Sequence, residues 1–198
     1  MKVRNKLRIL QYNVHKSRNK MMIALLQEEK IQEYNILVIQ ESWQHHVGIS
    51  AYNSRSANFT LVNNDEKTYF YINKRIDSNN WHNTWHSKDV ETITLQLQSL
   101  DDNTTRHNLV NVHDVYNSFL NSHNDTINKS NFLAMKLALH MQGESIIVKD
   151  FNLHHFSWGG PFYSRQHLLL ENLLDIMRAI GVVLTLSRGT ITRDYQGA

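Results

Sequence analysis

Short apolar runs in this sequence predict a series of β-strands. The run "ILVIQ" at 36–40 is continuous and apolar, which is typical of a strand that is covered on both of its faces. In "VETITLQL", alternate residues share one face of a strand, as expected for period-2 side-chain geometry. The predicted strands cover residues 7–14, 36–40, 68–74, 90–97, 108–113 and 145–148, with a last one beginning at "VVLTL" (182–186).

Three segments have the spacing of an amphipathic helix instead. They are predicted at 19–33, 126–142 and 164–180. For the third, Ser164 is a candidate N-cap and Gly181 a C-terminal stop. The segment "HNTWH" (82–86) is expected to be a loop whose two histidines hold no metal. Strands in hairpin-like series, interrupted by helices, predict one mixed α/β domain over 1–198.

Composition narrows the class of protein. A chain of 198 residues with 41% hydrophobic and 20% charged residues is expected to fold as a globular domain. The absence of cysteine excludes disulfides and thiolate metal sites. The sequence shows no apolar run of membrane-spanning length and no signal-peptide pattern. A net charge of +3 and a pI near 9.1 permit nucleic-acid binding without requiring it.

Polar residues that suit a catalytic site stand where the predicted strands end. Asn13 closes the first strand, Glu41 the second, Tyr116 follows 108–113, and Asp150 with Asn152 follows 145–148. Strand ends converge on one rim of a sheet, where such side chains can form a site. Carboxylate and carboxamide oxygens suit a hard cation such as Mg²⁺, and a tyrosine hydroxyl can orient a phosphate.

These positions lie within motifs that resemble the endonuclease domain of non-LTR (LINE-type) retrotransposons, a branch of the endonuclease/exonuclease/phosphatase superfamily. The motifs are "QYNV", "VIQES", "FYINKRI", "VETITLQL", "VYN" and, most specifically, "DFNLHHFSWGG" at 150–160. The resemblance implies a deoxyribonuclease-like, four-layered sandwich, in which two mixed β-sheets lie face to face with helices outside.

The resemblance also implies a function and a set of site residues. Asn13 and Glu41 correspond to the metal side, Tyr116 to the phosphate-orienting tyrosine, and Asp150 with Asn152 to the pair that positions the nucleophile and the scissile phosphate. The implied activity is DNA nicking with Mg²⁺ or Mn²⁺ as cofactor. The implied setting is the nucleus, with a reverse transcriptase encoded downstream.

The chain departs from the family pattern in ways that bear on activity. The family continues into a Ser-x-Ile-Asp strand and a Ser-Asp-His motif that supplies the general base, whereas this sequence ends "TRDYQGA". The family's "VYNPP" and "HHPSWGG" read "VYNSF" and "HHFSWGG". A domain lacking its last strands is therefore expected, with weak or no nicking; His154 is the first candidate for a substitute base.

Two other functions remain open on the sequence. A catalytically dead remnant could keep nucleic-acid or metal affinity, and it would retard DNA without nicking it. Another superfamily branch could hydrolyse phosphomonoesters or lipid phosphates, although "SWGG" (157–160) argues against that.

Overall fold

The computed structural model describes residues 6–14, 19–40, 56–63, 68–87, 90–101, 104–116 and 140–150, together with residues 175, 178, 179 and 181. The chain divides into two compact units, Met1–Asp150 and Phe151–Ala198. The expectation of one domain over 1–198 stays a prediction. Within the described part of the chain, no helix is long and apolar enough to cross a membrane.

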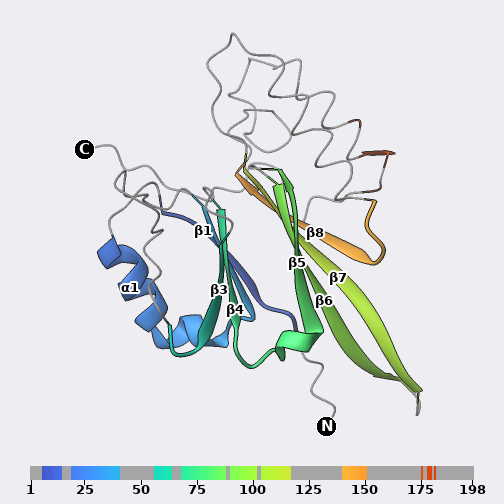
Figure 1. Cartoon of the computed structure of the whole chain (residues 1–198), viewed down its shortest axis with the longest axis horizontal. Coiled ribbons are helices and arrows are strands. Elements are labelled where there is room, and N and C mark those ends of the chain that lie inside the picture. Colours follow the sequence, from blue (N-terminus) through green and yellow to red (C-terminus); the bar gives the residue numbers. More distant parts are fainter. Residues whose placement is uncertain are drawn as a thin grey trace, which may run out of the picture. The chain divides into compact units, whose positions relative to one another are not determined.

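The described residues of the first unit form two mixed four-stranded sheets (Figure 1). The first sheet has the order β1-β2-β4-β3, with β1 parallel to β2 and the other pairs antiparallel. The second has the order β5-β6-β7-β8, with only β7 and β8 parallel. The strands are β1 (Ile9–Asn13), β2 (Ile36–Gln40), β3 (Phe59–Asn63), β4 (Thr68–Asn73), β5 (Trp81–Ser87), β6 (Val90–Asp101), β7 (Thr104–Tyr116) and β8 (Glu144–Asp150).

Two hydrophobic clusters explain how the layers stack. One joins the inner faces of both sheets, with Ile36, Val38 and Phe70 from the first sheet and Ile93 and Val112 from the second. All five are fully buried, so the sheets lie face to face over a shared apolar core. The other cluster covers the outer face of the first sheet with the helices α1 (Asn19–Gln27) and η1 (Glu29–Glu33).

The predicted architecture of two mixed sheets packed in a sandwich is therefore confirmed. Of its four layers, the described residues contain both sheets and the helical layer over the first sheet. The strand predictions at 7–14, 36–40, 68–74, 90–97, 108–113 and 145–148 are confirmed as β1, β2, β4, β6, β7 and β8. The predicted strand at 182–186 and most of the predicted helix at 126–142 lie outside the described residues.

The predicted helix at 19–33 is wrong in its second half. The α-helix ends at Gln27, Glu28 is extended (φ −69°, ψ 130°), and a short 3₁₀ helix follows. The core explains the break. Leu26 is buried, and a residue five positions further along a continuous helix would lie about 140° around its axis. The break instead brings Ile31 into the same cluster, where it is 7% exposed.

The loop predicted at 82–86 is also wrong, because these residues form most of the edge strand β5. Antiparallel pairing with β6 gives this polar segment backbone partners that local sequence does not reveal. The expectation that His82 and His86 hold no metal does not depend on the loop. In a strand their Cα atoms stand about 13 Å apart, and the absence of a metal at this pair stays an expectation. Strand β3 was not predicted at all.

The C-terminal end predicted for the helix at 126–142 is wrong as well. Residues 140–143 form a turn and bend that lead into β8. Gly143 has φ +114°, and a Cβ there would lie 2.5 Å from the Leu109 carbonyl oxygen, so only glycine fits. In the second unit, by contrast, Gly181 confirms its prediction as a helix stop. It follows helical residues, has φ +72°, and its N–H donates to the Arg178 carbonyl at 3.1 Å.

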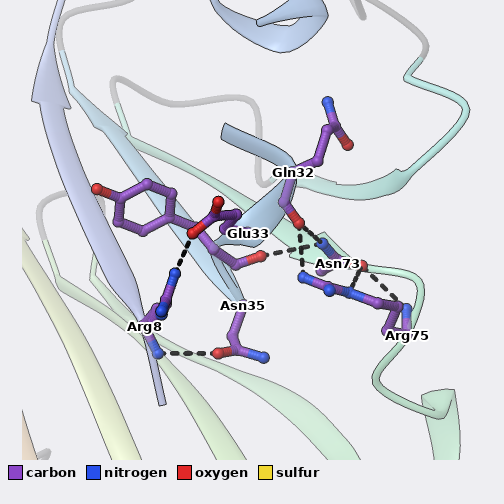
Figure 2. Close-up of polar contacts among 7 residues, drawn as sticks. Arg8, Gln32, Glu33, Asn35, Asn73 and Arg75 are labelled. Carbon is purple, nitrogen blue, oxygen red and sulfur yellow. Dashed lines mark hydrogen bonds and ion pairs between the residues drawn. The ribbon is translucent and has the colours of Figure 1, made fainter. Parts of the chain in front are cut away.

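Asn73 joins the end of β4 to the 3₁₀ helix through a fully satisfied side chain (Figure 2). Its Nδ2 donates to the carbonyls of Gln32 at 3.1 Å and Tyr34 at 2.9 Å. Its Oδ1 accepts from the backbone N–H of Arg75 at 3.1 Å and from the Arg75 Nε at 3.2 Å. Asn73 is 3% exposed, so no water can replace these partners without rearrangement.

We expect Asn73→Ala to lower the free energy of unfolding by about 2–3 kcal/mol, because it removes all four hydrogen bonds of a buried side chain, two donated and two accepted. Asn58→Ala, an exposed asparagine in the segment leading into β3, is the matched control and should change little. Urea-induced unfolding of both variants measures the difference. Equal midpoints for the two variants would contradict this role for Asn73.

Candidate active site at the carboxyl ends of four strands

The site predicted from sequence begins at the last rung shared by β1 and β2. These strands are parallel, and Asn13 pairs in register with Gln40. Ile9 packs in the inter-sheet core, so alternation places Gln11 and Asn13 on the same inner face as Gln40. Asn13 is half-buried and Gln40 fully buried. Glu41, the predicted metal ligand, directly follows Gln40 but lies outside the described residues.

The second sheet brings Tyr116 and Asp150 to neighbouring positions. They form the last rung of the parallel pair β7–β8, so their Cα atoms are about 4.8 Å apart. The sequence separates these residues widely, and only strand pairing makes them neighbours. Asn152 and His154, the other predicted catalytic residues, lie outside the described residues. The roles assigned to all six residues stay predictions.

Two consecutive hydrogen bonds connect strands β1 and β2 of the first sheet to strand β7 of the second, near the carboxyl ends of these strands. Gln11 Nε2 donates to Gln40 Oε1 at 2.9 Å, and Gln40 Nε2 donates to Asp114 Oδ1 at 2.5 Å. Asp114 lies on β7 two residues before Tyr116 and belongs to the inner face that carries Val112. The ends of β1 and β2 therefore meet the end of β7 at one rim of the sandwich.

Two buried carboxyl groups lie just below this rim. Glu91 on β6 and Asp114 on β7 are cross-strand partners, and they are 2% and 0% exposed. Asn83 Nδ2 donates to Glu91 Oε1 at 2.6 Å, while Asp114 Oδ2 is buried without a hydrogen-bond partner. Two carboxylates so placed cannot both ionise at ordinary cost, which favours protonation of at least one.

The pKa values of this pair move in the direction that burial dictates. Burial raises the pKa of Glu91 from 4.5 to about 7, against a smaller lowering by the Asn83 hydrogen bond. Burial also raises the pKa of Asp114 well above 3.8; the Gln40 hydrogen bond opposes that rise, and the Glu91 charge adds to it. At neutral pH the pair therefore holds at least one proton, and its negative charge is reduced.

A second polar chain crosses the opposite face of the same sheet. Thr92 Oγ1 is 2.9 Å from His86 Nε2 and 2.8 Å from His113 Nδ1, and His113 Nε2 is 3.1 Å from Ser145 Oγ. Burial, with a smaller contribution from the charge of the neighbouring His86, lowers the pKa of His113 from 6.5 to about 4. The His113 imidazole is consequently neutral and bridges two hydroxyls. These hydrogen bonds connect β5 to β8 on the outer face of the second sheet, opposite to the inner face that carries Glu91 and Asp114.

These shifts give stability a pH dependence whose two parts have opposite signs. A raised folded-state pKa means that the stabilising contribution of Glu91 is present at low pH and is lost as pH rises from about 4.5 to about 7. His113, whose folded-state pKa is lowered, loses its contribution as pH falls from 6.5 towards 4.

Glu91→Gln should isolate the carboxyl part, because the amide keeps the acceptor for Asn83 and cannot ionise. We expect the variant to match the wild type near pH 4.5 and to exceed it by up to about 3 kcal/mol above pH 7. Urea unfolding between pH 4.5 and 8 measures this difference, with the exposed Glu29→Gln as control. A pH-independent difference would show that Glu91 does not titrate as inferred.

The sequence reasoning missed the buried polar residues that organise the rim, namely Gln40, Asp114 and Asn83. In the alternating run "VETITLQL" (90–97), the sequence places Glu91 on one strand face and predicts no role for it. Their signal was present but weak: Gln40 ends an apolar run, and Asp114 follows an alternating one. Either pattern is also compatible with a solvated strand end.

The donor set at the rim suits a hard divalent cation. Carboxamide and carboxylate oxygens, such as those of Asn13 and Glu41, are the ligands that Mg²⁺ and Mn²⁺ prefer. The described ranges contain no group of three or more Asp, Glu, His or Cys side chains arranged to hold a metal. Of the two predicted metal ligands, Asn13 lies within the described residues and Glu41 does not.

Solved structures with a similar fold are known, whereas no protein-family model and no curated protein matches the sequence significantly. The endonuclease domain of TRAS1, a telomere-specific non-LTR retrotransposon, superposes with a TM-score of 0.59 at 13% identity, covering 88% of this chain and 72% of that one. The chain has the endonuclease/exonuclease/phosphatase fold. A protein of that family from Leptotrichia buccalis superposes with a TM-score of 0.54 at 13% identity, covering 86% of this chain and 73% of its own. At this identity, the likeness establishes the fold.

Proposed function

We propose that this endonuclease/exonuclease/phosphatase-fold chain is a divalent-metal-dependent DNA endonuclease of the retrotransposon type. The observation that carries the proposal is the hydrogen bond from Gln40 at the end of β2 to Asp114 near the end of β7. Gln40 pairs with Asn13 and directly precedes Glu41. Strand β7 ends at Tyr116, which pairs with Asp150. A fold neighbour is described as a retrotransposon endonuclease domain, which supports the same assignment.

In this proposal each side of the rim has a different task. Asn13 and Glu41 would hold a Mg²⁺ or Mn²⁺ ion, which when bound supplies Lewis-acid stabilisation to the scissile phosphate. Tyr116 orients the phosphate through its hydroxyl. Asp150 and Asn152 orient the attacking water, and a nearby base accepts its proton. His154, four residues beyond Asp150 in the sequence, is the candidate for that base.

The substrate, partners and cellular setting follow from the same proposal. The mildly basic chain, with a pI near 9.1, would bind DNA as a polyanion, and binding should weaken as salt rises. A reverse transcriptase encoded in the same gene would use the nick as a primer, and the nucleus would be the place of action.

Supercoiled plasmid tests the proposal against its alternatives. Conversion to open circles by the 198-residue chain with Mg²⁺, abolished by EDTA, would support an endonuclease. Retardation of DNA without nicking, at any metal concentration, would replace it with a binding module. Release of inorganic phosphate from a phosphomonoester, with intact plasmid, would instead assign the chain to the phosphatase branch of the fold.

A further inference from the structure

The hydrogen bond between Gln40 and Asp114 occupies an unusual place in the sandwich. It crosses from the inner face of one sheet to the inner face of the other, at 2.5 Å, between two side chains that are 0% exposed. The inner-face positions directly below on the same strands are apolar, Val38 on β2 and Val112 on β7. Along β2 and β7, the contact between the sheets thus changes from apolar to polar at the strand ends that carry the candidate site.

We infer that Gln40 and Asp114 are positioning residues that set the separation between the metal side and the phosphate side of the proposed active site. Gln40 immediately precedes Glu41 and pairs with Asn13, and Asp114 precedes Tyr116 by two residues, about 7 Å along β7. A bond between these two side chains fixes the strand ends that carry both halves. The inference rests on the proposed function, since it concerns the geometry of that same site.

Stability alone does not account for this pair. Asp114 has a buried oxygen, Oδ2, without a hydrogen-bond partner, and it stands opposite a second buried carboxyl group, Glu91. Apolar residues of similar size would avoid both costs, because replacing buried polar pairs by apolar ones is often neutral or stabilising. Departures of this kind from good core packing concentrate at functional sites, where geometry matters more than stability.

The reason that geometry matters here is the division of the site between two sheets. Hydrophobic contact is non-directional, whereas a short hydrogen bond fixes both the distance and the direction between two groups. Misplacement of a reacting group by about 1 Å can cost about 100-fold in rate. Gln11, which donates to Gln40 Oε1 at 2.9 Å, holds the Gln40 amide in the orientation that directs its N–H groups at Asp114.

Three variants and a matched control separate positioning from folding. Gln40→Met and Asp114→Leu keep side-chain volume and remove the inter-sheet bond. Asp114→Asn keeps an acceptor oxygen for Gln40 and should preserve the geometry. The control is Thr94→Val, which removes a buried 2.8 Å hydrogen bond to Asn111 within one sheet, on the face away from the site. Urea unfolding of each variant establishes that it is folded.

Two measurements on the full chain then test the inference. The first is the plasmid-nicking rate with Mg²⁺, resolved into kcat and KM. The second is the factor by which Ca²⁺, a hard cation used to load the metal side, tightens binding of a labelled DNA duplex. Because the bond couples the two halves, Gln40→Met and Asp114→Leu should lower kcat by about 100-fold. They should also lose the Ca²⁺ effect, with metal-free DNA affinity unchanged.

The outcomes are distinguishable from failure of the proposed function. If the wild type neither nicks DNA nor shows a Ca²⁺ effect, the endonuclease assignment fails and the inference fails with it. If the wild type shows either effect and Gln40→Met and Asp114→Leu keep it to the same extent as Thr94→Val, the positioning role alone is overturned. If Asp114→Asn keeps the nicking rate and the Ca²⁺ effect while Asp114→Leu loses them, the positioning role is supported. If Asp114→Asn loses them as well, the effect belongs to the charge of Asp114 and the positioning role is overturned.

Discussion

Asp150→Ala is expected to reduce the Mg²⁺-dependent nicking of plasmid DNA, which the sequence predicts to be weak in the wild type, by about 100-fold or to the background of the assay. Asp150 ends β8 on the same rung as Tyr116, so its backbone is held by strand pairing and the substitution removes a side chain without displacing the strand. A carboxylate at this position would orient the attacking water and favour its deprotonation. The alanine methyl group can do neither.

Two companion variants make the Asp150 result specific. Asp150→Asn keeps the shape and one acceptor oxygen, so a partial loss would separate orientation from charge. Glu144→Ala removes an exposed carboxylate from the opposite end of β8 and should leave nicking unchanged. If Asp150→Ala nicks as fast as the wild type, the activity in the preparation does not come from this site, and the roles assigned to Asp150 and Asn152 fall with it.

Glu41→Ala should have the second-largest effect, on metal affinity. Glu41 is the carboxylate of the proposed metal side, and affinity for a hard cation follows the number of charged ligands. Loss of a residue that only supports a metal ligand costs roughly 10- to 100-fold in metal affinity. Because Glu41 is proposed as a ligand itself, we expect the Mg²⁺ or Mn²⁺ concentration at half-saturation to rise by more than that. Titration calorimetry with Mn²⁺ measures this directly and does not depend on turnover.

The matching control for Glu41 is Glu28→Ala, an exposed carboxylate between the two helical segments. It removes the same charge from the chain and should leave metal affinity unchanged, which separates a ligand from a general electrostatic contribution. Equal Mn²⁺ affinity in Glu41→Ala and the wild type would refute the placement of the metal side. The endonuclease proposal would then need another ligand set.

Much of the fold could be predicted because its elements carry strong local signals. Residues 36–40 form an apolar run of the kind typical of a strand covered on both faces, and β2 is fully buried. The alternation of Glu91, Ile93 and Leu95 correctly predicted one shared face. Gly181 predicted a helix stop, since its φ of +72° suits glycine.

The failures lie where long-range contacts override local preference. The polar segment 82–86 becomes strand β5 because β6 supplies its hydrogen-bond partners. The helix beginning at Asn19 stops at Gln27 because Ile31 must reach a core that a continuous helix would turn it away from. In neither case do the flanking residues contain the information, since the deciding partner lies elsewhere in the chain.

By itself, the sequence determined which residue types stand at the strand ends, and with them the chemistry proposed for the site. Asn13, Glu41, Tyr116 and Asp150 were predicted from strand ends and motifs alone. Only the tertiary structure decided that Tyr116 and Asp150 share a rung and that Gln40 bonds to Asp114 across the two sheets. Both depend on strand pairing and sheet packing between segments as many as 74 residues apart, and no local pattern records that.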